Sequence, residues 1–284
     1  DKDTSRGLGD VYKRQAFGVI VFLLTICLLP IGSKKIFLIN RPIFNNTSWG
    51  AMMFVAGMGA SILWASPVEW AQTMNSKPFG LDSTSNEIIE YSQAYPLFHW
   101  GFVGWALYAL PGVAFTIAIL KNPNVQLTFG GILIKNDDTL SKLIKNIFDV
   151  VFILAILAGA GVGMGVSFPV IAEMTSYLVG INNSFSFQIL VLIFCLCIFG
   201  TSVYKGLESG IKRLSNINVL LVIAMLLIIL IVGPTKYILS NSIESTFFMF
   251  KNYIDMSFFS ESSFAQSWTV FYWAWWMALA PVSY

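Results

Sequence analysis

Seven long apolar stretches alternate with short polar segments along the chain. They run over residues 16–33, 48–74, 95–120, 147–172, 186–204, 215–239 and 266–284. Each comes near the roughly 20 residues that a helix needs to cross a bilayer. A backbone in lipid must satisfy its own hydrogen bonds, and these runs are too long and continuous for barrel strands. The pattern therefore predicts about seven membrane-spanning helices.

The composition agrees with a single membrane domain. Hydrophobic residues make up 56% of the chain and charged residues only 11%, whereas soluble domains carry roughly 25% charged residues. The one histidine, His99, has no second His, Cys or carboxylate at metal-ligand spacing. We therefore predict an all-α integral membrane protein that is not an enzyme, with no cofactor and no nucleic-acid partner.

Basic residues are distributed unevenly between the loops. The loops after the first, third and fifth stretches hold ten Lys and Arg, and the alternate loops hold three. The positive-inside rule places the basic loops in the cytoplasm. Residues 1–15, with four basic residues, would then lie outside the cell. We therefore interpret 1–15 as a non-native polar tail, or expect a further span before residue 16, and regard 16–284 as a transmembrane domain incomplete at both ends.

Residues 240–265 mix aromatic side chains with Ser, Asn and acids. The segment is too polar to span the membrane and too aromatic for a free loop. We predict an amphipathic helix lying along the outer interface.

The second stretch contains Gly57-Met58-Gly59-Ala60-Ser61. Two glycines at i and i+2 each weaken a helix by about 1 kcal/mol relative to alanine. A break here would free backbone groups at mid-membrane for a carboxylate or an ion. Small residues also allow a neighbouring helix to pack closely, and this stretch alone favours packing.

Aromatic residues gather in the third and last stretches. Trp100, Trp105 and Tyr108 fall within one arc of a regular helix, and Trp276 lies in the last stretch. Such rings could form a cage for a quaternary ammonium group, but the first three residues taken alone favour an interfacial belt of Trp and Tyr. The acids Glu69, Asp149 and Glu173 lie toward the ends of their spans. We expect these acids to face the interface.

At these residues the sequence resembles the betaine/carnitine/choline transporter family. Five segments carry the resemblance: 54–64 with Glu69, 98–101 through 105–108, 206–218, 232–235 and 268–276. Members have twelve spans, built as two helices followed by a five-plus-five inverted-repeat (LeuT-like) core. The resemblance implies that this chain covers spans two to eight, with the first repeat complete and the second truncated. It also implies a multi-pass protein of the bacterial inner (plasma) membrane, and a homotrimer.

The resemblance also implies a substrate site. The family's aromatic box for trimethylammonium corresponds to Trp100, Trp105, Tyr108 and Trp276, and we include Trp275. The glycine break that holds the carboxylate end of betaine corresponds to Gly57, Met58, Gly59, Ala60 and Ser61. Choline-type members carry Asp where Ser61 stands, so a zwitterion is the expected substrate.

The coupling ion stays open between sodium and protons, as does substrate exchange. Sodium-coupled members use hydroxyl residues in the fourth span, where this chain has Ala160, Val162 and Gly163. A second sodium site would use backbone carbonyls near Val55 and Met58.

The sequence therefore predicts secondary active transport of a quaternary-ammonium zwitterion, such as glycine betaine or carnitine, by alternating access. The alternative is a seven-helix membrane sensor or receptor that binds a ligand without moving it. The absence of a mid-membrane lysine for retinal and the tryptophan-rich last stretch count against this alternative.

Overall fold

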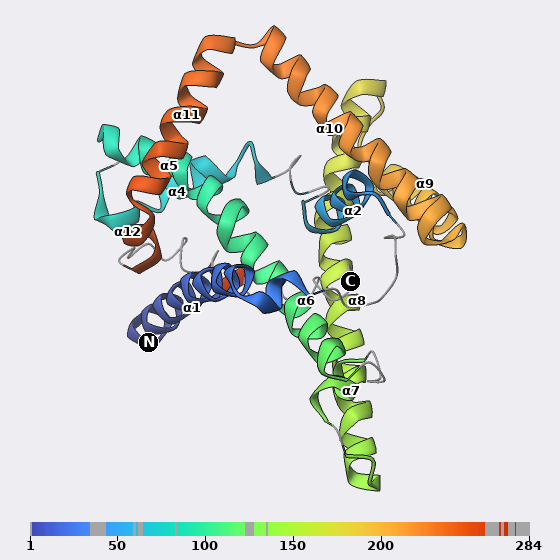
Figure 1. The fold of residues 1–284 in the computed structure, drawn as a ribbon. Helices are drawn as coiled ribbons and strands as arrows, with labels where there is room; N and C mark the ends of the chain where they lie inside the picture. Colours follow the sequence, from blue (N-terminus) through green and yellow to red (C-terminus); the bar gives the residue numbers. More distant parts are fainter. Residues whose placement is uncertain are drawn as a thin grey trace.

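All the regular secondary structure in the part of the chain that the structure describes is helical (Figure 1). The computed structural model describes residues 2–34, 44–58, 61, 65–82, 84–122, 128–134, 136–258, 267, 270, 271 and 276. Within these residues, five helical segments are long and apolar enough to cross a membrane. They are Val11–Leu28, Asn86–Lys121, Thr139–Val179, Phe185–Tyr204 and Leu207–Val232.

These five segments correspond to five of the seven predicted spans. Of the predicted span 48–74, the structure describes α2 (Asn46–Met58) and α4 (Glu69–Asn75), while residues 59, 60 and 62–64 lie outside the described part. Most of 266–284 also lies outside it. The remaining two spans, and the expected helix break at 57–61, therefore stay predictions.

The first helix starts earlier than its apolar stretch. Helix α1 covers Lys2–Leu28 and is followed by a short 3-10 turn, η1 (Pro30–Ser33). Residues 2–15 thus form the beginning of α1, and the Lys13 side chain is only 1% exposed. The interpretation of residues 1–15 as non-native stays a prediction.

The third predicted span consists of two helices joined by a π-helical turn. Helix α5 (Asn86–Phe98) begins where the Ser85 side chain accepts a hydrogen bond from the Ile88 backbone N–H, which caps the helix. The π turn η3 (His99–Val103) follows, and α6 (Gly104–Lys121) continues. Helix α4 and the 3-10 turn η2 (Pro78–Gly80) precede α5, and α4 packs against it.

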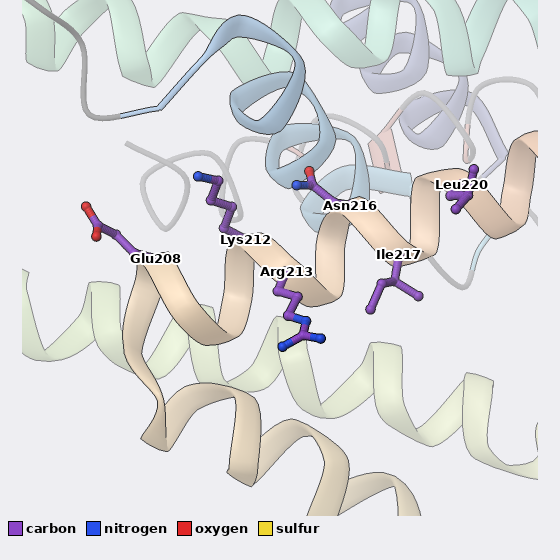
Figure 2. A pocket seen from close by; sticks show the side chains of 6 residues that line it. All are labelled: Glu208, Lys212, Arg213, Asn216, Ile217 and Leu220. Carbon is purple, nitrogen blue, oxygen red and sulfur yellow. The ribbon is translucent and has the colours of Figure 1, made fainter.

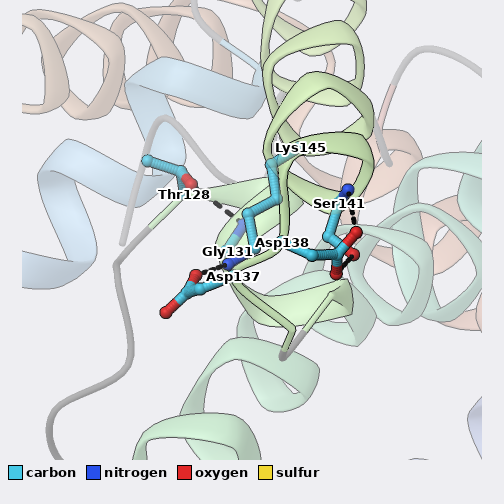
Figure 3. A network of polar contacts seen from close by, with 6 residues as sticks. All are labelled: Thr128, Gly131, Asp137, Asp138, Ser141 and Lys145. Atoms are coloured by element: carbon cyan, nitrogen blue, oxygen red, sulfur yellow. Dashed lines mark hydrogen bonds and ion pairs between the residues drawn. The ribbon is translucent and has the colours of Figure 1, made fainter.

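Short polar contacts fix the start of the longest helix (Figure 3). The Asp138 side chain caps α8 (Thr139–Val179) by accepting from the Ser141 backbone N–H, and Lys145 Nζ donates to Asp137 Oδ1 at 2.7 Å. This hydrogen bond lowers the pKa of Asp137. Helix α7 (Phe129–Leu133) packs against α8. At about 60 Å, α8 is longer than the bilayer core and extends beyond the expected range 147–172.

Gly180 ends α8 in the left-handed backbone region, with φ of 72°. We expect Gly180→Ala to lower the free energy of unfolding by about 1 kcal/mol, because a Cβ is strained in this conformation. Gly180→Asn should lower it less, since Asn tolerates the left-handed region. Thermal unfolding in detergent would measure both changes. The control is Gly161→Ala inside α8, where an added Cβ meets no heavy atom within 4 Å; destabilisation by this control equal to that of Gly180→Ala would contradict the prediction.

Helices α9 (Phe185–Tyr204) and α10 (Lys212–Val232) are joined through a π turn, η4 (Leu207–Ile211). The expected range 215–239 was wrong at its end, because α10 stops before Gly233 and Pro234. Proline has no backbone N–H for a continuing helix. Helix α10 packs against α2, and Asn216 Nδ2 donates to Ser48 Oγ at 3.1 Å.

The segment expected to be amphipathic is helical as far as Phe258. It forms α11 (Thr235–Lys251) and α12 (Tyr253–Phe258), and residues 259–265 lie outside the described part. Figure 1 shows α11 crossing from the end of α10 toward α5. There Phe248 contacts Tyr91 edge-on, with 4.9 Å between ring centroids. A position along the membrane surface stays a prediction.

The protein core lies where α1, α5, α6, α11 and α12 meet. Its largest members include Tyr95, Phe98, Leu107, Tyr108 and Trp276. By contrast, α8, α9 and α10 expose many Leu, Ile, Val and Phe side chains, which is the surface expected in contact with lipid. The core therefore concentrates on the helices that carry the predicted aromatic site.

Candidate aromatic substrate site

Four of the predicted site residues converge on one point. Trp276 is 1% exposed and makes edge-to-face contacts with three other rings. The centroid distances from Trp276 are 6.1 Å to Trp100, 5.6 Å to Trp105 and 5.7 Å to Tyr108. Trp105 and Tyr108 also contact each other at 5.7 Å. Residues about 170 positions apart in the sequence thus form one aromatic cluster, which we call the aromatic box.

The π turn changes how the box is built. Trp100 lies in η3, whereas Trp105 and Tyr108 lie in α6. Gly101 within the turn has φ of −86° and ψ of −121°, which is not helical. The expected regular helix was therefore wrong for this segment, although the three rings do lie in one cluster with Trp276. The irregular turn shifts the direction of Trp100 relative to the other two rings.

Two glycines make room for the central indole. A Cβ on Gly57 of α2 would lie 3.1 Å from Trp276 Cζ3, and one on Gly104 of α6 would lie 3.3 Å from Trp276 Cε2. Both distances are shorter than ordinary van der Waals contact. Trp276 is therefore packed directly against the backbone of two helices, one of which carries the predicted site residue Gly57.

A cavity of about 350 Å³ opens beside the box. Its wall is mostly apolar and includes Trp100, which also contacts Trp276. The lining residues are Met58, Ser61, Ser66, Glu69, Pro96, Leu97, Trp100 and Gly101. Two residues of the predicted glycine break, Met58 and Ser61, therefore lie at the cavity beside the aromatic box.

Three residues of the predicted site, Gly59, Ala60 and Trp275, lie outside the described residues. Val55 is half-buried in α2, and its neighbour Met58 lines the cavity. A sodium ion at the Val55 and Met58 carbonyls stays a prediction.

Glu69 does not face the interface, and that expectation was wrong. Its side chain is 1% exposed at the start of α4. Trp100 Nε1 donates a hydrogen bond to Glu69 Oε2, and His99 Nδ1 lies 3.7 Å from Glu69 Oε1. His99 is equally buried.

Sequence reasoning therefore missed two polar neighbours of the box, Glu69 and His99. The available signal was an acid within a largely apolar stretch, since ionisable groups within membrane segments are costly and usually functional. Asp149 is half-buried and accepts from the Gly130 backbone N–H at 2.7 Å. Glu173 is exposed and is contacted by Asn183.

A second hollow of about 360 Å³ lies at the start of α10, far along the sequence from the box residues (Figure 2). It is lined by Glu208, Lys212, Arg213, Asn216, Ile217 and Leu220. Figure 2 shows the Lys212 and Arg213 side chains diverging from the helix. None of the described residues that line this hollow is aromatic. The aromatic box and its adjacent cavity are therefore the better candidate for a cationic solute.

Comparison with known proteins gives a consistent family assignment. The family model described as "BCCT, betaine/carnitine/choline family transporter" matches residues 3–283. A carnitine transporter of Acinetobacter baumannii is 29% identical over 275 residues, covering 94% of this chain and 49% of the relative. The glycine betaine transporter OpuD of Bacillus subtilis is 32% identical over 275 residues, covering 92% of this chain and 52% of the relative.

An uncharacterized transporter of Escherichia coli, YeaV, is 29% identical over 251 residues, covering 85% of this chain and 51% of the relative. The chain thus spans about half the length of the curated relatives that it matches.

Proposed function

Because the chain belongs to the betaine/carnitine/choline transporter family, we propose that the protein carries a quaternary-ammonium zwitterion across the membrane by secondary active transport. It is a multi-pass protein of the bacterial plasma membrane. Relatives named for transport of carnitine and glycine betaine support a solute of this class over the sensor alternative.

The observation that carries the proposal is the convergence of three tryptophans and a tyrosine. Trp276 meets Trp100, Trp105 and Tyr108 within 6.1 Å of their centroids. The faces of such rings attract a trimethylammonium group through cation–π interactions, each worth up to about 2 kcal/mol in a desolvated site. The ammonium end of the substrate would bind here.

The carboxylate end of the substrate would bind at the glycine stretch of α2. Gly57 contacts the box, and Met58 and Ser61 line the neighbouring cavity. Ser61 contributes a neutral hydroxyl at the position where choline-type members carry Asp. A carboxylate at this position would favour a cation without a carboxylate of its own. This arrangement supports a zwitterion over choline.

The rings now fill the centre of the box themselves. Trp276 is 1% exposed and touches all three partners, so a substrate head group would have to separate these rings to enter. Alternation between states that open this site to opposite sides of the membrane would move the substrate. The Val55 and Met58 carbonyls are the proposed contacts for sodium, if sodium is the coupling ion.

The proposal is tested by ligand titration of the purified product of the complete gene. We expect saturable quenching of tryptophan fluorescence by glycine betaine or carnitine, with weaker quenching by choline. The matched control is 3,3-dimethylbutanoate, which has the shape of glycine betaine without its positive charge. It should bind about 30-fold more weakly, corresponding to a cation–π contribution of about 2 kcal/mol.

Titration with and without sodium would show at the same time whether sodium promotes substrate binding. Equal binding of glycine betaine and 3,3-dimethylbutanoate would remove the cation–π argument. An absence of response to all trimethylammonium solutes would overturn the proposed function.

A further inference from the structure

Glu69 is a buried carboxylate that the proposed binding mode does not use. It is 1% exposed, in a chain where most of the surface is apolar. A carboxylate in such surroundings is destabilising unless other groups stabilise it. A negative charge in the first turn of α4 also interacts favourably with the helix dipole. An exposed carboxylate would make the same interaction without being buried. Its burial needs a separate explanation.

The partners of Glu69 lie on the helix segment that carries the box. Trp100 Nε1 donates to Glu69 Oε2, across 31 positions in the sequence. His99 Nδ1 lies 3.7 Å from the other carboxylate oxygen. Lys13 of α1 is also buried. The carboxylate thus joins α4 to η3 at Trp100, a member of the box, and lies near the adjacent His99.

Trp100 depends on such a contact because its own backbone is irregular. It lies in a π turn, where Gly101 departs from helical geometry, so regular helix hydrogen bonding does not fix its direction. Its indole is half-buried, lines the cavity and contacts Trp276 at an interplanar angle of 76°. A small rotation of this ring would change both the cavity and the box.

We propose that Glu69 is a positioning residue for the substrate site: its carboxylate accepts the indole N–H of Trp100 and thereby holds this ring against Trp276 as one wall of the aromatic box. The inference rests on the proposed function for its effect on binding. The rival role is direct pairing of the carboxylate with the substrate ammonium group. The two roles differ in whether the effect of Glu69 passes through Trp100.

The contact itself can be tested without substrate. In the product of the complete gene, labelled with indole-¹⁵N tryptophan, the Trp100 N–H signal is identified by its loss in Trp100→Phe. We expect this signal to move upfield in Glu69→Ala, because the charged acceptor is gone. Glu69→Gln keeps the volume and a neutral acceptor, so it should give a smaller shift and covers the case in which Glu69→Ala does not fold.

The control for the spectroscopy is Glu90→Gln, which makes the same change at an exposed acid of the adjoining α5. It should leave the Trp100 signal in place. An unchanged Trp100 signal in both Glu69 variants would overturn the proposal.

Binding then distinguishes positioning from direct pairing. We expect Glu69→Ala to weaken glycine betaine binding about tenfold, and Glu69→Gln less. If Glu69 acts through Trp100, adding Glu69→Ala to Trp100→Phe should give no further loss. If the loss of affinity in the double variant equals the product of the losses in the two single variants, Glu69 acts independently of Trp100. That result would overturn the proposal. If the unmodified protein binds no trimethylammonium solute, the proposed function fails, while the indole signal still decides whether Glu69 positions Trp100.

Discussion

Replacing Trp276 with alanine is expected to weaken glycine betaine binding by about 30-fold or more, since the change removes roughly 2 kcal/mol of cation–π attraction. Trp276 contacts each of the other three rings of the box. Its loss therefore removes one wall and also the surface against which the other rings are packed. Trp276→Phe keeps an aromatic face and should weaken binding less. Calorimetry would measure both affinities without relying on tryptophan fluorescence.

The control for this prediction is Trp49→Ala on α2, which removes a tryptophan that is 50% exposed. We expect its affinity for glycine betaine to equal that of the unmodified protein. Because truncating a buried tryptophan destabilises a core by about 3–5 kcal/mol, thermal unfolding should accompany each titration. A folded Trp276→Ala protein with unchanged affinity would show that the substrate binds elsewhere.

A valine at Gly57 is expected to weaken binding about tenfold. The Cβ alone would lie 3.1 Å from Trp276 Cζ3, and the two γ-methyl groups need more space in the same gap. The indole would have to move away from α2, which changes its contacts with Trp100 and Trp105. Overpacking of this kind typically costs about 1–3 kcal/mol. Equilibrium binding of radiolabelled glycine betaine would measure the loss.

Gly50→Val is the matched control, because it lies in the same helix and an added Cβ there meets no heavy atom within 4 Å. It makes the same change in helix propensity as Gly57→Val without the collision. Equal losses of affinity in the two variants would indicate that flexibility of α2, rather than contact with Trp276, explains the effect.

The members of the box could be predicted because they follow from a resemblance in sequence. Trp100, Trp105, Tyr108 and Trp276 come together as expected, although helical periodicity alone placed only the first three near one another. The approach of Trp276 to them is a long-range contact, which local patterns do not contain. The glycine at position 104 was also missed, because its role is visible only once the indole beside it is placed.

The limits of local reasoning are clearest at Glu69 and at the end of α10. The position of an acid near the end of an apolar stretch suggested the interface, but its burial depends on α4 packing against α5. The predicted span extended past Gly233 and Pro234 because it was drawn from hydropathy. These two residues end the helix but change the polarity of the sequence little. Five spans were predicted well because their length and apolar content reflect the bilayer itself.

The hydrogen bond from Asn216 to Ser48 has a consequence for movement. It joins the beginning of α10 to the helix whose Gly57 supports Trp276. Interhelical hydrogen bonds of this kind contribute on average about 0.6 kcal/mol in membrane proteins, which is close to thermal energy. The Asn216–Ser48 hydrogen bond therefore favours one position of α2 relative to α10 only weakly. Ordinary thermal fluctuation is enough to break it and allow the two helices to shift.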